Sequence, residues 1–379
     1  MPNSRNDPSA PAELACPQCG ETVRPIPLLL GYPTPEAFEQ AARGEVVLGG
    51  CLVSNDDPEW ACPVCGGGIW SVNGPPLEER LAGAVWGHLV GDAIGVPYEF
   101  GPPMSAEAVR FGARGTHGQP PGTWSDDGAL MLALLDSLLE VGFDTTDQAR
   151  RALAWYREGR YTPDGDGAFD VGIATRSALT AIEAGASPES AGAPDAGGNG
   201  SLMRILPLAL VGRDWSDEEL VDRAHRATKV IHGHPVAAVC SALYVLVARG
   251  LLEGRLGRML VMGEALFTLH GLYSAERHPA AYRDGLAFLE RYPERRGKGR
   301  AWDSFWSAWD AFAEADSYED TIRRAVAYGE DTDTTAAIAG GLAGIQWGIG
   351  GIPAEWLSSM RGRDVAWPLI ERLVASAAD

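Results

Sequence analysis

Apolar side chains recur every three or four residues along most of the chain after residue 76, and this spacing places them on one face of an α-helix. The pattern is strongest in four segments, LEERLAGAVWGHLVGDAIG (77–95), ALMLALLDSLLEVG (129–142), TDQARRALAWYREG (146–159) and PVAAVCSALYVLVARGLLEG (235–254). Alternation typical of strands is scarce, and only residues 230–231 and 365–367 look locally strand-like. We therefore predict an all-α domain of about ten helices or more over residues 76–379.

The first 75 residues follow a different pattern. The run PEAFEQAA (35–42) predicts a short helix, and a strand-like run follows at residues 45–48. The sequence Asn73-Gly74-Pro75-Pro76 is typical of a linker. We therefore predict two domains, residues 1–75 and residues 76–379.

Two C-x-x-C pairs stand in the first domain, at Cys16 and Cys19 and at Cys62 and Cys65. Each pair can present two thiolates to one tetrahedral zinc ion, and a domain this small needs such a staple because it has little core. The 42 residues between the pairs exceed the usual ~15–20. A redox-active pair is the alternative, but no thioredoxin-like pattern surrounds either pair.

The segment LGGCLVSNDDPEWACPVCG resembles small zinc-ribbon proteins of bacteria. We therefore expect a small zinc-ribbon-like β unit with one structural Zn²⁺. Residues 1–75 hold nine acidic and three basic side chains. This balance favours a structural role or contact with a protein partner over binding of nucleic acid.

The whole chain of 379 residues has 51 acidic and 31 basic side chains and a formal charge of −20. Such a charge argues against strong non-specific binding of nucleic acid or of an anionic membrane. The start of the chain has no apolar leader, so we expect a cytoplasmic protein. The uncharged stretch 334–354 is long enough to cross a bilayer, but it contains six glycines and Pro353. We expect it to pack inside the protein, with no membrane association.

Acidic and hydroxyl residues concentrate at two places where a loop leads into a predicted helix, WSDDG (124–128) and GEDTDT (329–334). Helix capping explains one such residue at a helix start. Each of these junctions carries at least two acids and a hydroxyl, and adjacent carboxylates repel unless a cation lies between them. Oxygen ligands without nearby His or Cys select Mg²⁺, Mn²⁺ or Ca²⁺. Two such clusters facing each other would form a site for two metal ions.

Two further polar features stand outside these two junctions. Asp92 interrupts an apolar helix, and Glu99 lies just past its end. The loop GGNGSLMR (197–204) lets the backbone approach a ligand closely and precedes a helix start that can bind an anion. It lacks a Walker lysine, so a plain flexible loop is the alternative.

In order along the chain, the segments GAVWGHLVGDAIGVPYEF, WSDDGALM, FDVGIATRSAL, GNGSLMRILPLAL, IHGHPVAA and GEDTDTTAAIAGGLAGIQWGI resemble the ADP-ribosylglycohydrolase family. The resemblance runs from about Leu77 to Trp356 and excludes the cysteine pairs. It implies an orthogonal multi-helix, all-α fold with two Mg²⁺ or Mn²⁺ ions in a cleft.

The resemblance also implies roles for individual residues. The family's metal ligands are matched by Ser125, Asp126, Asp127, Asp331, Asp333 and Thr334. Its substrate-binding positions are matched by Asp170, Gly172, Asn199, Gly200, Ser201, Met203 and His232. Glu99, Asp126 and Asp331 are the candidate catalytic carboxylates, and which of them acts as the base is left open. Asp92 matches a Gly-Asp landmark whose role is structural or functional.

The sequence departs from the family pattern at three positions. Gly128 and Ile231 replace threonines, and Ser125 replaces a threonine while keeping the ligand oxygen. These changes bear on substrate preference more than on metal binding. For His232, a hydrogen-bonded supporting or core histidine is as reasonable as a substrate contact.

The resulting hypothesis is a hydrolase with two metal ions that cleaves ADP-ribose from a protein side chain, a nucleic acid or a small molecule. The metals would hold the ribose hydroxyls and activate water, and a carboxylate would take the proton. The alternative is an immunity or binding protein that docks on an ADP-ribosyltransferase, with catalysis secondary. A catalytically inactive family member is a third reading, opposed by the intact set of ligand oxygens.

Overall fold

The computed structural model describes residues 14–16, 19–30, 34–49, 60–69, 75–165, 167–254, 257–274 and 278–377. The chain divides into two compact units, Met1–Gly74 with Glu253–Gly263, and Pro75–Leu252 with Glu264–Asp379. This division also places Glu253–Gly263 in the first unit. The expected two domains, residues 1–75 and 76–379, therefore stay a prediction.

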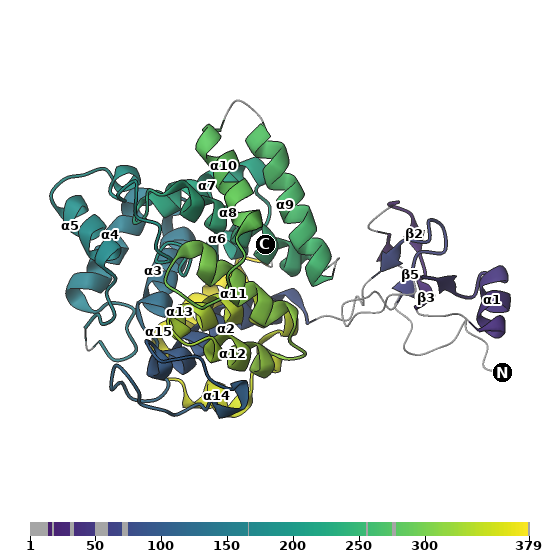
Figure 1. The fold of residues 1–379 in the computed structure, drawn as a ribbon, viewed down its shortest axis with the longest axis horizontal. Helices are drawn as coiled ribbons and strands as arrows, with labels where there is room; N and C mark the ends of the chain where they lie inside the picture. Colours follow the sequence, from purple (N-terminus) through teal and green to yellow (C-terminus); the bar gives the residue numbers. More distant parts are fainter. Residues whose placement is uncertain are drawn as a thin grey trace. The chain divides into compact units, whose positions relative to one another are not determined.

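The described residues of Met1–Gly74 form short strands and one helix (Figure 1). Strands β1 (Leu14–Ala15) and β2 (Thr22–Val23) form an antiparallel pair. A second sheet has the order β4 (Val47–Leu48), β3 (Ile26–Leu29), β5 (Trp60–Ala61) and β6 (Gly68–Ile69). Strands β3 and β4 are parallel, and the α1 helix (Pro35–Ala42) connects them.

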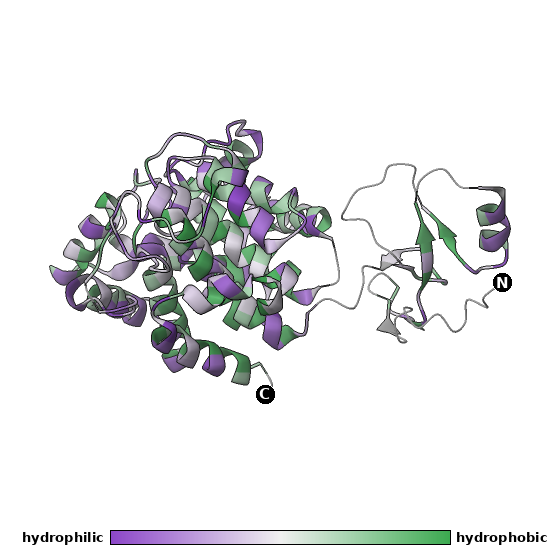
Figure 2. Ribbon diagram, turned by 90° about the horizontal axis from the view of Figure 1, so that it is seen from below, coloured by the Kyte–Doolittle hydropathy of each residue, from purple (hydrophilic) through white to green (hydrophobic). Residues whose placement is uncertain are grey.

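Helix α1 begins where the sequence predicts. Thr34 caps it, because its Oγ1 accepts a hydrogen bond from the Ala37 amide at 3.3 Å. Figure 2 shows α1 as mostly hydrophilic, and Ala37 is the one buried residue among its described side chains.

The second unit is helical, which confirms the all-α prediction. Its helices are α2 (Leu77–Gly95), α3 (Asp126–Val141), α4 (Thr145–Glu158), α5 (Ile173–Glu183), α6 (Pro207–Val211), α7 (Asp217–Lys229), α8 (Pro235–Glu253), α9 (Arg258–Ser274), α10 (Ala280–Arg291), α11 (Ala301–Ala313), α12 (Tyr318–Ala327), α13 (Thr332–Trp347), α14 (Ala354–Ser359) and α15 (Arg363–Ala375). The strand-like appearance of residues 365–367 was misleading, since they lie inside α15, and residues 230–231 form a turn after α7. Both runs are too short for their β-branched residues to outweigh the helical periodicity around them.

Helices α2 and α13 form the centre of the second unit and pack against each other with almost no side chains between them. Glycines on α2 meet backbone on α13: a Cβ at Gly87 would lie 2.3 Å from the Gly340 oxygen, and one at Gly91 would lie 2.2 Å from the Ala336 oxygen. One turn further, a Cβ at Gly95 would lie 2.4 Å from the Asp333 Cα. This close crossing fixes the start of α13 beside the end of α2.

The described helices include one, α8, that is long and apolar enough to cross a membrane, and 83% of its apolar stretch is buried inside the structure. Burial of this extent is that of a core helix. The uncharged sequence from residue 334 onward forms most of α13, which is buried from Thr332 to Ile345.

Candidate metal centre and substrate cavity

The two acidic junctions meet although 207 residues separate them. Helix α3 begins at Asp126 with Ser125 as its N-cap, and the Ser125 hydroxyl accepts a hydrogen bond from the Asp127 amide at 3.3 Å. Helix α13 begins next to it, and the Thr334 hydroxyl donates to Asp127 Oδ2 at 3.2 Å. The predicted metal ligands of both helix starts therefore lie in one cluster.

Asp92 supports this cluster from behind. Its carboxylate accepts hydrogen bonds from the Ser125 amide at 2.9 and 3.0 Å and from the Gly128 amide at 2.7 Å. It thus caps α3 from a different helix, and burial raises its pKa to about 7. These contacts give Asp92 a structural role, which answers the question left open by the sequence.

The carboxylates of the cluster are buried and crowded. Desolvation first, and neighbouring carboxylates second, raise the pKa values of Asp126, Asp127 and Asp333 well above the usual range. Desolvation also raises the pKa of Asp331, and desolvation followed by the charges of Asp170 and Asp331 raises that of Glu99 to about 9. Such a set of charges needs compensation by protons or by cations.

The oxygens of the cluster are of the kind that binds hard cations. Asp127 Oδ1 and Asp333 Oδ2 are buried and have no hydrogen-bond partner among the described residues. Oxygens of Glu99, Asp331 and Asp333 lie within 4.8 Å of one another, close enough to share one ion. Buried carboxylate oxygens without donors are the ligand set of a hard divalent cation.

A cavity of about 280 Å³ opens beside these carboxylates. Ten of the site residues identified from the sequence line it: Glu99, Asp126, Asp170, Gly172, Asn199, Gly200, Met203, His232, Asp331 and Thr334. Four others, Ser125, Asp127, Ser201 and Asp333, are buried and are not part of the lining. At the lining's edge, Phe100 is 69% and Ile173 is 86% exposed, so two apolar side chains face solvent there.

The glycine-rich loop at residues 197–204 is tied to the carboxylates. The Asn199 side-chain amide donates to Asp331 Oδ2 at 2.8 Å and to Ser304 Oγ at 2.9 Å. A Cβ at Gly299 would lie 2.9 Å from the same Asp331 oxygen. The loop is therefore held against the carboxylate cluster. No motif in the sequence pointed to Ser304 or Gly299.

His232 lies against the same loop in one defined tautomer. The Ser201 hydroxyl donates to the Thr228 carbonyl at 2.9 Å, so its 2.8 Å contact with His232 Nδ1 is a hydrogen bond donated by the imidazole. Desolvation, helped by Arg204, lowers the pKa of His232 to about 4. A neutral imidazole whose Nε2 is an acceptor thus lines the cavity, while Ser201 acts as its support.

His117 is a further residue of this site that the sequence analysis did not identify. Its Nε2 contacts Glu99 Oε2 and lies 3.9 Å from Asp170 Oδ1. The histidine belongs to no motif identified in the sequence, and it lies in a segment without regular secondary structure.

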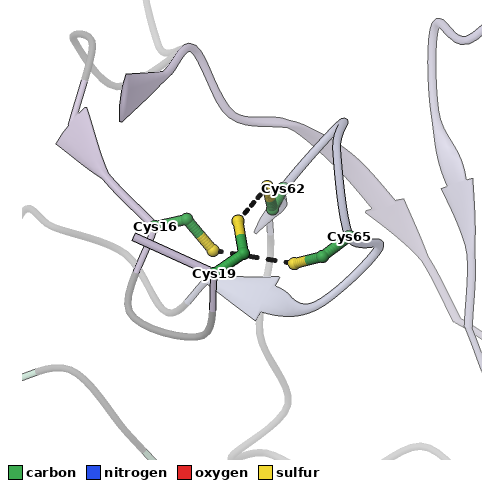
Figure 3. Close-up of side chains that lie close together, drawn as sticks. All are labelled: Cys16, Cys19, Cys62 and Cys65. Carbon is green, nitrogen blue, oxygen red and sulfur yellow. Dashed lines mark hydrogen bonds between the residues drawn. The ribbon is translucent and has the colours of Figure 1, made fainter. Parts of the chain in front are cut away.

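The four paired cysteines also come together (Figure 3). The Sγ atoms of Cys16 and Cys65 are 3.7 Å apart, those of Cys19 and Cys62 are 3.8 Å apart, and all four lie within 4.8 Å of one another. A tetrahedron with bonds of about 2.3 Å has sulfur–sulfur edges of about 3.8 Å.

The two cysteine pairs have the same backbone geometry. The Gly20 and Gly66 amides donate to the carbonyls of Cys16 and Cys62, both at 2.9 Å. Both glycines have positive φ, +76° and +72°, a conformation that side chains disfavour. The glycine after each pair is thus held in the same way, and the sulfurs of the two pairs are directed at one another.

Comparisons with known proteins match this site and fold. The sequence profile of the family described as ADP-ribosylglycohydrolase matches residues 73–379. The ADP-ribosylarginine hydrolase Tri1 of Pseudomonas putida is 28% identical over 294 residues, covering 76% of this chain and 75% of the relative. The ADP-ribosyl-[dinitrogen reductase] glycohydrolase of Rhodospirillum rubrum is 29% identical over 302 residues, covering 76% and 92%.

A solved structure described as an ADP-ribosylglycohydrolase-related protein complex superimposes with a TM-score of 0.64 at 36% identity, covering 79% of this chain and 99% of the solved one. Together with the helical fold and the carboxylate-lined cavity, these matches define a hydrolase of glycosidic bonds. The chain belongs to the ADP-ribosylglycohydrolase family. The matched segment contains all carboxylates of the candidate metal centre and excludes the four paired cysteines.

Proposed function

We propose that the protein cleaves the glycosidic bond between ADP-ribose and a modified acceptor and that two divalent cations, Mg²⁺ or Mn²⁺, occupy the carboxylate cluster. The observation that carries this proposal is the meeting of two acidic helix starts, with two buried carboxylate oxygens that no group in the described part of the chain satisfies. Asp126, Asp127, Asp331 and Asp333 would hold the ions, with the hydroxyls of Ser125 and Thr334 as further oxygen ligands.

When bound, the cations would neutralise these carboxylates, hold ribose hydroxyls and make water more acidic. The protein supplies the positions. Asn199 fixes Asp331 through its 2.8 Å hydrogen bond, and Asp92 fixes the start of α3. In this proposal Glu99 is the general base that accepts a proton from the attacking water. It lines the cavity and, unlike the four aspartates, does not belong to the start of α3 or α13.

The chemical group to which ADP-ribose is attached in the substrate is also part of the proposal. The relative from P. putida is named for ADP-ribosylarginine and the one from R. rubrum for a modified protein, dinitrogen reductase. An arginine-linked ADP-ribose is therefore the first substrate to test here, beside ADP-ribosyl-serine, ADP-ribosyl-DNA and O-acetyl-ADP-ribose.

The test measures release of ADP-ribose by the full-length protein with Mg²⁺, with Mn²⁺ and with EDTA. We expect Asp126→Asn and Asp331→Asn to lower kcat at least about 100-fold. Asp320→Asn is the matched control, because Asp320 is also an acid in the first turn of a helix but pairs with Arg324 at 2.7 Å, outside the cavity. Release of ADP-ribose at the same rate in EDTA would contradict the proposal.

We also propose that the four paired cysteines bind one Zn²⁺ ion that stabilises the first unit and takes no part in hydrolysis. The 3.7 and 3.8 Å sulfur separations support a tetrahedral site in which all four positions are filled by cysteines. Metal analysis of the purified protein should find one zinc per chain, lost in Cys62→Ser and kept in Cys240→Ser, whose thiol is buried in α8. One zinc per chain in both variants would contradict the assignment.

A further inference from the structure

We propose that His117 is a positioning residue that holds the carboxylate of Glu99 in place for the reaction; this inference rests on the proposed hydrolase function. The imidazole is 18% and the carboxyl group 5% exposed, so both are largely shielded from water. The Nε2 atom contacts Glu99 Oε2 and faces Asp170 Oδ1 at 3.9 Å. When Glu99 is ionised, as it must be to accept a proton from water, both neighbours of Nε2 are acceptors and Nε2 is the donor of this contact.

Two aromatic rings lie near the imidazole, and each belongs to a residue next to one of the two acids in the sequence. Phe100, next to Glu99, has its ring centroid 6.1 Å from that of His117, and Phe169, next to Asp170, has its centroid at 5.6 Å. The two segments that carry the acids thus converge on one histidine.

Both segments adopt backbone conformations that non-glycine residues disfavour. Phe100 has φ +60° and Asp170 has φ +54°. Such a conformation costs about 1–3 kcal/mol and persists where surrounding contacts enforce it. The disfavoured conformations thus stand at one of the acids that His117 approaches, Asp170, and directly after the other, at Phe100.

The segment that carries His117 is itself fixed to the backbone around Glu99. The Thr116 hydroxyl donates to the Glu99 carbonyl at 2.7 Å, and the Thr116 amide donates to the Pro97 carbonyl at 3.1 Å. Gly115 makes this approach possible, because a Cβ there would lie 1.5 Å from the Pro97 oxygen. The histidine and the carboxyl group are therefore held at a fixed separation.

This arrangement opposes a repulsion that the cavity creates. The charges of Asp170 and Asp331 push against the Glu99 carboxylate, and burial removes the water that would screen them. A donor at Oε2 fixes one oxygen and leaves Oε1 for the reacting water. Without that donor, Glu99 is free to rotate away from Asp170.

The test compares steady-state kinetics of ADP-ribose release for His117→Ala and His117→Gln. We expect His117→Ala to lower kcat about 10- to 100-fold with KM changed less than about threefold, because misplacing a catalytic group mainly affects the transition state. Glutamine carries an N–H donor at a similar reach and should restore kcat to within about threefold of wild type. His270→Ala is the matched control, because His270 also pairs with a glutamate, Glu290 at 2.9 Å, but lies outside the cavity lining.

A double-mutant cycle then separates positioning from a general structural effect. In a Glu99→Gln background, His117→Ala should change kcat less than about twofold, because the group to be positioned is already lost. The bound divalent cations are counted in the same samples, and the number per chain should be equal in wild type and His117→Ala. An equal loss in both backgrounds, a glutamine variant as slow as alanine, or one cation fewer in His117→Ala would each overturn the inference.

One readout does not depend on turnover. In the Mg²⁺-loaded protein, nitrogen-15 NMR of the histidine side chains should show a proton on Nε2 of His117. A proton on Nδ1 alone would overturn the inference. A wild-type protein that releases no ADP-ribose would contradict the proposed function instead, and the NMR result would still decide the hydrogen bond.

Discussion

Substitution of Gly95 by alanine tests whether the crossing of α2 and α13 positions the metal centre. A Cβ at this position would lie 2.4 Å from the Asp333 Cα and 2.5 Å from both the Asp333 nitrogen and the Thr332 oxygen. Ordinary contact begins at 3.4 Å, so the first turn of α13 must move by about 1 Å. Gly95 has helical torsion angles, φ −71° and ψ −41°, so alanine adds steric overlap without backbone strain.

The expected cost follows from two opposing effects. Overpacking of a tight contact costs about 1–3 kcal/mol, and the lower backbone entropy of alanine in the unfolded chain returns about 0.5–1 kcal/mol. We expect the free energy of unfolding to fall by about 1 kcal/mol or more. A 1 Å displacement of a group in an active site can cost about 100-fold in rate, so kcat should fall by at least about tenfold.

The assay pairs urea unfolding, followed by far-UV circular dichroism, with ADP-ribose release at saturating Mg²⁺. Gly271→Ala is the control, because Gly271 lies in α9 and a Cβ there meets no atom within 4 Å. That variant should gain about 0.5–1 kcal/mol and keep its activity. If Gly95→Ala behaves like Gly271→Ala in both assays, the crossing does not position the centre.

Two further predictions concern the buried acids. Asp92→Asn should lower the free energy of unfolding, measured by urea titration, by about 1.5–3 kcal/mol. The reason is that only one side-chain oxygen remains to accept the three contacts from the Ser125 and Gly128 amides. An unchanged urea midpoint would refute this prediction. In cation-free protein, burial raises the pKa of Glu99 to about 9, so the folded state keeps protons that the unfolded chain has released, and stability should fall as pH rises from 7 to 9. The buried His88, His225 and His232 have lowered pKa values and stay neutral across this window. Added Mg²⁺ should flatten the curve, and stability that rises with pH without cations would contradict the assignment.

The local features of this fold follow from the sequence. The helices have clear apolar periodicity, and the acids of the candidate metal centre stand at the starts of α3 and α13. Ser125 does cap α3, so the capping explanation is correct for it at the same time as its carboxylate neighbours form the cluster. The glycines that directly follow the cysteine pairs, Gly20 and Gly66, fit the positive φ that the backbone has at both positions.

Features that depend on long-range packing did not follow from the sequence. The Gly-x-x-x-Gly spacing of α2 and α13 is visible, but nothing in it shows that Gly87 faces Gly340 or that Thr334 reaches Asp127 on α3. His117 escaped notice for a similar reason. It lies in irregular chain, and its role arises from two distant acids that only tertiary structure brings to it.

The most direct test of the account is a titration of chelator-treated protein with Mg²⁺, in which free ADP-ribose released from ADP-ribosylarginine is measured at each cation concentration. We predict no release before Mg²⁺ is added, recovery of turnover as Mg²⁺ binds, and no recovery in Asp331→Asn at the same concentrations. Full release by the chelator-treated protein, or recovery in Asp331→Asn equal to that of wild type, would contradict a reaction centred on cations held by the starts of α3 and α13.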